Sequence, residues 1–174
     1  RALNALMVFL VAVAAYNFRW GIGFVDFREL QTKVHKYGIV RSSLTDTTGA
    51  AACTTLVRFY GVNVGEGWMA RSTLSRPRGG ASVIGLCHGV RTALEGTGAH
   101  VRIRDLEYSQ LRTTPMPALL IVDEGAAETQ ALVLFSIDEE GALVGDPRRG
   151  LNFIDHESLE RIWQGLAIVV AAPP

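Results

Sequence analysis

The period of the hydrophobic pattern changes near residue 100, and this change constrains the fold more than any other feature of the sequence. Within residues 49–60, apolar residues recur at three- and four-residue intervals, the spacing of one helix face: Cys53, Leu56, Val57 and Tyr60. Further helices are predicted over residues 66–74 and 82–95. After residue 100, short runs rich in Val, Leu and Ile predict strands: HVRIRDL, PALLIVD, ALVLFSI, GALVGD and LAIVVA. Helices followed by an antiparallel sheet predict an α+β domain.

Turn residues separate these elements. Gly38 is predicted to end a short helix over residues 27–37. The sequence DEEG joins ALVLFSI to GALVGD as a hairpin, in which Gly141 is expected to take the positive φ that such turns require. DPRRG is predicted to form another turn, and HESLERIWQ a short helix before the last strand.

The N-terminal segment is the most apolar part of the chain. Residues 5–16, ALMVFLVAVAAY, carry no charge. A membrane span needs about 20 helical residues, so the apolar stretch is marginal in length. It is apolar on all sides, and aromatic residues gather at its end, which favours a transmembrane helix over residues 1–20 with membrane lipid around residues 2–18. A buried or partner-bound helix is the alternative. Basic residues that follow favour the cytoplasmic side for the downstream domain.

The length of the chain limits the number of domains. A chain of 174 residues can bury one core and is too short for two ordinary domains. The sequence therefore predicts an apolar helix over 1–20, a connector over 21–41 and one α+β domain over 42–172.

Charge and metal-binding residues exclude several functions. Seventeen basic residues balance seventeen acidic ones, so no overall field attracts nucleic acid. Cys53 and Cys87 are too few for a disulfide framework, and the histidines occur singly, so no metal site is predicted. GGASVIG lacks the Lys-Ser/Thr pair of a phosphate loop, and no cofactor is expected. Both cysteines lie among apolar residues and are predicted to be buried side chains rather than reactive thiols.

Three stretches, in this order, carry a resemblance to a known family: TGAAACTTLVRFYGV, GGASVIGLCHGVRTALEGTGAHV and GDPRRGLNFIDHESLERIWQGLAIVV. They resemble the bacteriocin-processing cysteine peptidases, which are papain-like peptidases that cleave double-glycine leaders and are often fused to export transporters. The resemblance covers about residues 42–170. It implies a papain-like fold and a catalytic cysteine at the start of the first domain helix.

The resemblance also assigns positions to the family's catalytic residues. Thr48 stands where the family has its cysteine, and Ser42 where it has the glutamine that helps to bind the oxyanion. The histidine base falls on Gln130 or its neighbours Thr129 and Glu128. Asp146, in the D-P turn, matches the aspartate that orients the histidine. The chain therefore departs from the family pattern at both the nucleophile and the base.

Other residues do not restore the missing groups. Cys53 lies five residues after Thr48, about 7.5 Å along the helix and about 140° around it, so its thiol points elsewhere. Cys87 and His88 are consecutive and do not face each other on a helix. Thr48 or Thr47 is predicted to cap the helix N-terminus, and Asp146 to bond the backbone of its own turn.

Two functions follow. The first is a catalytically inactive, membrane-tethered peptidase-like domain that binds a protein or peptide, as a subunit of a membrane complex or export system. The second is an active cysteine- or threonine-dependent peptidase with a rearranged site, whose base the fold or a partner chain supplies.

Overall fold

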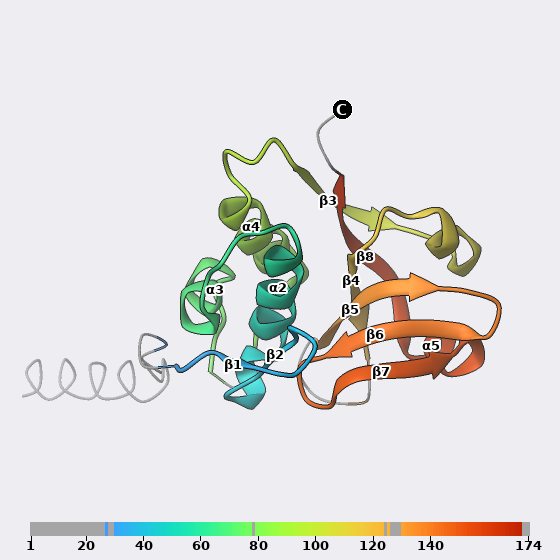
Figure 1. Ribbon diagram of the computed structural model, residues 1–174, viewed down its shortest axis with the longest axis horizontal. Helices are drawn as coiled ribbons and strands as arrows, with labels where there is room; N and C mark the ends of the chain where they lie inside the picture. Colours follow the sequence, from blue (N-terminus) through green and yellow to red (C-terminus); the bar gives the residue numbers. More distant parts are fainter. Residues whose placement is uncertain (1–26, 28–29, 78, 124, 126–129, 172–174) are drawn as a thin grey trace, which may run out of the picture.

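The computed structural model describes residues 27, 30–77, 79–123, 125 and 130–171 (Figure 1). The predicted transmembrane helix, residues 1–20, lies outside these residues. Within the described part of the chain, no helix combines the length and the apolar composition that crossing a bilayer requires.

Three helices form one layer, as the spacing of apolar residues predicts. They are α2 (Thr48–Phe59), α3 (Glu66–Ser72) and α4 (Val83–Ala93). Glycines let them approach closely: a Cβ on Gly49 would lie 2.8 Å from Leu86 Cδ2, and one on Gly85 would overlap the Thr73 carbonyl oxygen. The Ser82 hydroxyl caps α4 by accepting a hydrogen bond from the Gly85 N–H at 3.1 Å.

The second half of the chain forms a six-stranded antiparallel sheet in the order β3-β8-β4-β5-β6-β7. Its strands are β3 (His100–Asp105), β4 (Ala118–Val122), β5 (Gln130–Ile137), β6 (Gly141–Asp146), β7 (Gly150–Asp155) and β8 (Trp163–Ala171). The 3-10 helix η3 (Tyr108–Thr113) follows β3, and α5 (His156–Ile162) precedes β8. The predicted α+β order is confirmed. The hydrophobic pattern predicts neither η3 nor β7. Strand β7 is an edge strand, and five of its six residues are partly buried or exposed.

Each face of the sheet has its own hydrophobic core. In β4, Leu119 and Ile121 pack with the helices, whereas Leu120 and Val122 pack on the other face with Leu159 and Trp163. Figure 1 shows α2, α3 and α4 together on one side of the sheet. The β4 side chains are buried on both faces, which explains why PALLIVD has a continuous apolar run rather than an alternating one.

The described residues of the connector, 27 and 30–41, do not form the helix predicted over residues 27–37. Residues 33–41 form a hairpin instead, with β1 (Lys33–Val34) paired to β2 (Val40–Arg41). Gly38 has φ +79° and closes the turn. Ile39 and Val40 are fully buried, and the Val40 N–H donates to Thr55 Oγ1 at 2.9 Å. Burial of this pair against α2 is a long-range effect, and it overrides the local helical pattern.

The β5–β6 hairpin forms as predicted, but Gly141 does not adopt a positive φ. The Asp138 carboxylate closes the turn by accepting hydrogen bonds from the N–H groups of Glu140 and Gly141, at 2.9 and 3.1 Å. Gly141 has a different role: a Cβ there would overlap the Ile154 carbonyl oxygen of β7.

Candidate functional site

A buried glutamate organises the segment that leads into α2. Glu66 is 0% exposed, and its carboxylate accepts hydrogen bonds from the Ser43 N–H (2.8 Å), the Ser43 hydroxyl (2.7 Å) and the Thr47 hydroxyl (2.5 Å). The Glu66 N–H donates to Thr32 Oγ1 at 2.9 Å. One residue at the start of α3 thus holds the connector, the segment that contains Ser42, and the N-terminus of α2. The sequence analysis missed this role, because an acidic residue in a first helical turn is common.

The capping prediction for α2 is wrong in its mechanism. Thr47 is the N-cap residue, but its side chain makes no cap hydrogen bond. Its hydroxyl accepts from the Leu44 N–H at 3.2 Å and donates to Glu66. Thr48 is the first residue of α2 and is 4% exposed. Among the described residues, no histidine is hydrogen-bonded to Thr48.

α2 lies alongside β5, and the two elements begin at the same end. Phe59, the last residue of α2, stacks near Phe135 of β5, with ring centroids 6.1 Å apart. Thr48 precedes Phe59 by eleven residues, a rise of about 16 Å along a helix. Gln130 precedes Phe135 by five residues, about 16 Å along a strand. The N-terminus of α2 and the first residue of β5 therefore lie level with each other, as Figure 1 also shows.

Asp146 and Ser42 lie at this same end. Asp146 directly follows Gly145, which pairs with Val133 of β5. Its Oδ1 accepts from the Arg148 N–H at 2.7 Å, as predicted for its own turn, and its Oδ2 lies 3.9 Å from Arg149 Nε. The Ser42 N–H donates to the Pro147 carbonyl at 3.0 Å. The structure thus gathers all four positions that the resemblance assigns to a catalytic site.

Of the four side chains at this end, that of Gln130 has a buried polar atom without a hydrogen-bond partner among the described residues. Gln130 is 5% exposed, and within the described part of the chain its Nε2 has no hydrogen-bond partner. An unpaired buried amide donor typically costs about 1–3 kcal/mol. Gln130 is one of the three positions to which the resemblance assigns the histidine base; the other two, Glu128 and Thr129, lie outside the described residues.

The histidines lie elsewhere or lack a partner for catalysis. His156, at the start of α5, accepts from the Tyr108 hydroxyl through Nδ1 at 2.9 Å and donates through Nε2 to the Asp138 carbonyl at 3.0 Å. This places it at the opposite end of β6 from Asp146. His88 and His100 are exposed on α4 and β3. No three His, Cys, Asp or Glu side chains of the described residues cluster as a metal site requires.

His35 is the histidine that the structure brings near the D-P turn. Its Cε1 lies 3.4 Å from the Cβ position of Gly150, the residue paired with Asp146. The sequence analysis missed this proximity because His35 belongs to the connector and carries no local signal. In the described part of the chain, no hydroxyl or thiol is hydrogen-bonded to the His35 ring.

The cysteines occupy the core, as predicted. Cys53 is fully buried, and burial, together with the nearby Cys87, raises the pKa of its thiol far above the usual range. Burial also raises the pKa of Cys87, although Arg91 partly opposes the shift. Both groups stay protonated at neutral pH, so neither is a ready thiolate nucleophile.

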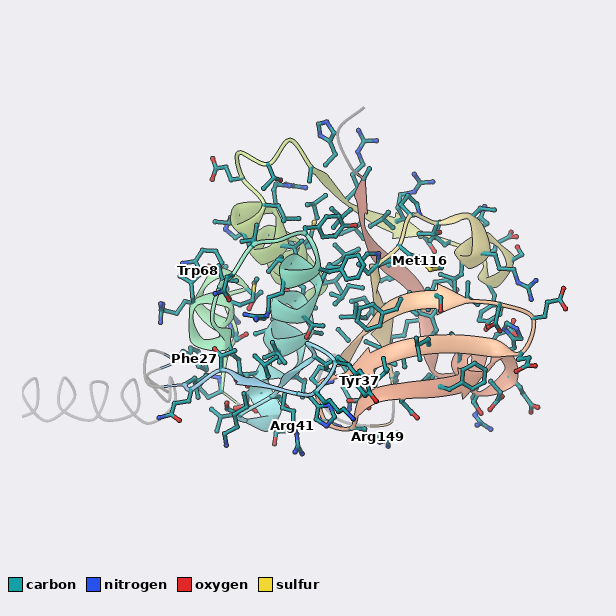
Figure 2. All side chains as sticks on the ribbon, in the orientation of Figure 1. Phe27, Tyr37, Arg41, Trp68, Met116 and Arg149 are labelled. Carbon is teal, nitrogen blue, oxygen red and sulfur yellow. The ribbon has the colours of Figure 1, made fainter. Side chains whose placement is uncertain are left out.

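Two openings flank α2. A shallow cleft of about 460 Å³ is formed by the segment before α2 and the D-P turn, with Ser42, Thr45 and Pro147 among its lining residues. Figure 2 shows Arg41 and Arg149 at this end of the molecule. The second opening, of about 320 Å³, lies beside the C-terminal half of α2 and is called the aromatic groove here; its lining residues are Tyr37, Gly38, Thr55, Arg58, Phe59, Gly61, Val62, Asn63 and Phe135.

Solved structures with the same fold are peptidase domains. A double glycine motif protease from an AMS/PCAT transporter, in complex with its leader peptide, aligns with a TM-score of 0.67 and 16% identity, over 80% of this chain and 91% of that one. The peptidase domain of Streptococcus ComA, a bi-functional ABC transporter, aligns with a TM-score of 0.67 and 19% identity, over 77% of this chain and 96% of that one. These likenesses establish an α+β, papain-like peptidase fold with an antiparallel sheet.

Sequence comparison gives a consistent result. The colicin V secretion/processing ATP-binding protein CvaB of Escherichia coli is 26% identical over 154 residues, which is 88% of this chain and 20% of that protein. The chain thus spans about a fifth of the length of this relative. Residues 36–174 match the peptidase C39 family. Because this match covers most of the chain and the fold agrees with it, the chain belongs to the peptidase C39 family.

Proposed function

We propose that this chain is a catalytically silent C39 domain that binds an extended polypeptide segment. In this proposal residues 2–18 tether it to a membrane, where it serves as a subunit of an export complex. The observation that carries the proposal is an open aromatic groove beside α2, together with Thr48 and Gln130 at positions where the resemblance places a cysteine and a histidine.

The silent state follows from the groups at the catalytic end. Thr48 and Gln130 take the places of the family's cysteine and histidine, and a threonine hydroxyl needs an adjacent base to attack a carbonyl. The glutamine amide cannot accept a proton at neutral pH, and Asp146 is engaged with the backbone of its own turn. The scaffold at the end of the sheet is retained, whereas the proton-transfer pair is replaced.

The aromatic groove supplies a surface for an apolar peptide. Tyr37 and Phe59 are 59% and 64% exposed, and Phe135 lies between the helix and the hairpin side of the groove. Exposed aromatic side chains that line one opening are characteristic of recognition sites. Thr55, which lines the groove, follows Thr48 by seven residues, about 10 Å along α2. Three residues of an extended peptide span the same distance, so one peptide can reach from the groove to the catalytic end.

The relatives support a polypeptide as the ligand. One solved neighbour is a protease in complex with its leader peptide, and CvaB is a secretion and processing protein. A silent domain that keeps the groove would hold such a segment without cutting it. The other subunits of an export complex are the expected partners.

A binding measurement tests the groove. A fluorescent peptide rich in Leu and Phe, in which Gly-Gly is followed by several further residues, is titrated with the full chain and with Phe59→Ser. Because Phe59 is 64% exposed, its replacement should leave the fold intact. Loss of its apolar contact should weaken binding about ten-fold or more. Phe153→Ser is the matched control: this phenylalanine is 50% exposed on edge strand β7, and its replacement should not alter binding. Equal effects of the two variants would exclude the groove.

A turnover assay tests the silent state. The same peptide is incubated with the chain and analysed by mass spectrometry, in parallel with a thiol-directed activity probe. We expect no cleavage after Gly-Gly and no labelling of Cys53 or Cys87 in the native protein. Cleavage that is lost in Thr48→Val, or specific labelling of either cysteine, would support the rearranged peptidase instead.

A further inference from the structure

A basic and apolar stretch runs through α3, α4 and the segment between them, and none of its residues lines the aromatic groove. From Gly67 to Leu94 the sequence contains four arginines and one histidine, but no aspartate or glutamate. The chain as a whole has equal numbers of acidic and basic residues, so this segment concentrates positive charge. Arg71 and Arg76 are exposed.

Two large apolar side chains of this stretch are exposed to solvent. Leu74 is 67% exposed and Ile84 is 76% exposed, the highest values for large apolar residues in the described part of the chain. Leu74 also has φ +55°, in the left-handed region that leucine rarely adopts. Neither burial nor backbone preference therefore explains a leucine at this position.

Packing between the helices brings these side chains to one corner of the domain. A Cβ on Gly85 would overlap the carbonyl oxygen of Thr73, so the residues that adjoin Leu74 and Ile84 are in contact. Arg76 lies two residues after Leu74 and forms an isolated bridge with Gly80. We call Arg71, Leu74, Arg76 and Ile84 the α3–α4 face.

Acidic groups near the α3–α4 face are few. The Glu66 carboxylate is fully buried and bonded to Ser43 and Thr47. Asp46 lies beside Gly80, with its carbonyl oxygen 3.6 Å from the Cβ position of that residue. Among the described residues, one nearby carboxylate is set against two exposed arginines, so their charges favour a positive potential at this face.

The chain enters the domain at α3. A Cβ on Gly67 would overlap the Phe27 carbonyl oxygen, so the backbone at Phe27 lies directly against this helix. Figure 2 shows Phe27 and Trp68 on the side of the domain away from β6 and β7. Seven residues separate Phe27 from the end of the predicted membrane helix at residue 20, a reach of at most about 25 Å. This step rests on the proposed tether, whereas the charge and the exposure of the face do not.

We propose that the α3–α4 face docks on a bilayer that contains anionic lipids. Leu74 and Ile84 enter the headgroup region, and Arg71 and Arg76 pair with lipid phosphates. Interfacial binding combines buried apolar area with attraction to anionic lipids, and this face offers both. An acidic protein would match the arginines but would leave the two aliphatic side chains unexplained.

Arginine footprinting of the full chain tests the docking. The protein is treated with phenylglyoxal in the presence of phosphatidylcholine vesicles, or of vesicles with phosphatidylcholine and phosphatidylglycerol at three to one. Each arginine near an anionic surface adds roughly five-fold to partitioning, and two add roughly 25-fold, so Arg71 and Arg76 should react at least about ten-fold more slowly on the anionic vesicles. Arg102 and Arg104, exposed on edge strand β3, are the internal controls and should react equally with both. High salt should remove the protection.

Variants separate the apolar contribution from the charge. Leu74→Ser with Ile84→Ser should reduce the protection of Arg71 and Arg76, whereas Ile103→Ser on β3 should not. The proposal is overturned if Arg71 and Arg76 react equally fast on both kinds of vesicle, or if Arg102 and Arg104 are protected as strongly as Arg71 and Arg76. It is also overturned if the double variant keeps the full protection. Protection that appears only when polyglutamate is added, and not with anionic lipid, would overturn it as well. None of these results depends on peptide binding in the groove, so the two proposals fail separately.

Discussion

Replacement of Glu66 by alanine should destabilise the domain more than any exposed glutamate replacement. Glu66→Ala removes a fully buried carboxylate that accepts from the Ser43 N–H, the Ser43 hydroxyl and the Thr47 hydroxyl. A hydrogen bond to a charged group contributes about 1.5–3 kcal/mol, and a buried donor left without a partner costs about 1–3 kcal/mol. Water can reach the part-buried Ser43 bonds but not the buried Thr47 bond.

The free energy of unfolding should therefore fall by about 3 kcal/mol or more. This is roughly the loss of the buried hydrogen bond from Thr47 to the carboxylate plus a partial loss of the two bonds from Ser43. For a chain of this size, that lowers the melting temperature by about 6–12 °C. Thermal and urea unfolding followed by far-UV circular dichroism measure both quantities.

Glu157→Ala is the matched control for this prediction. Glu157 also lies in the first turn of a helix, α5, but it is exposed. Its replacement should change the free energy of unfolding by less than about 0.5 kcal/mol. If Glu66→Ala and Glu157→Ala lower the free energy of unfolding equally, the Glu66 carboxylate does not hold the segment before α2.

Three further predictions concern packing, the unpaired amide and a buried thiol. Gly67→Ala should cost about 2 kcal/mol or more in urea unfolding because its Cβ would overlap the Phe27 carbonyl, whereas Gly79→Ala, with no atom within 4 Å of its Cβ position, should be near neutral. Gln130→Met should raise the free energy of unfolding by about 1 kcal/mol, because it removes a buried donor without a partner among the described residues; a loss would show that the amide is satisfied. The raised pKa of Cys53 predicts that stability falls above pH of about 9, where only the unfolded thiol ionises, by up to about 1.4 kcal/mol per pH unit. Cys53→Ala should flatten that slope, measured by urea unfolding from pH 8 to 10.5.

The hydrophobic pattern predicts the regular elements well, for a physical reason. Residues 49–60 and 82–95 repeat at the helical spacing, and the runs after residue 100 are buried on one or both sides of a sheet. Each pattern is the direct consequence of one element facing a core. The pattern did not predict the edge strand β7, because GLNFID is only partly buried and combines polar with apolar side chains.

Turn and hairpin geometry depends on contacts that lie far apart in sequence. The sequence predicted a positive φ at Gly141, yet the Asp138 carboxylate makes the turn, and the glycine is needed where β7 approaches. The helix predicted over residues 27–37 fails because Ile39 and Val40 are buried against α2. Local propensity is a weak preference, and burial of two large side chains outweighs it.

The sequence by itself determined the order of the elements, the absence of a cysteine and a histidine at the positions that the resemblance assigns, and the family to which the chain is related. These are properties of residue type and spacing, which need no coordinates. Tertiary structure alone decided that Glu66 holds the segment before α2, that His35 lies near the D-P turn, and that Leu74 and Ile84 share an exposed corner. Each of these depends on which distant segments pack together, and packing is set by the shape of the whole core rather than by any local stretch.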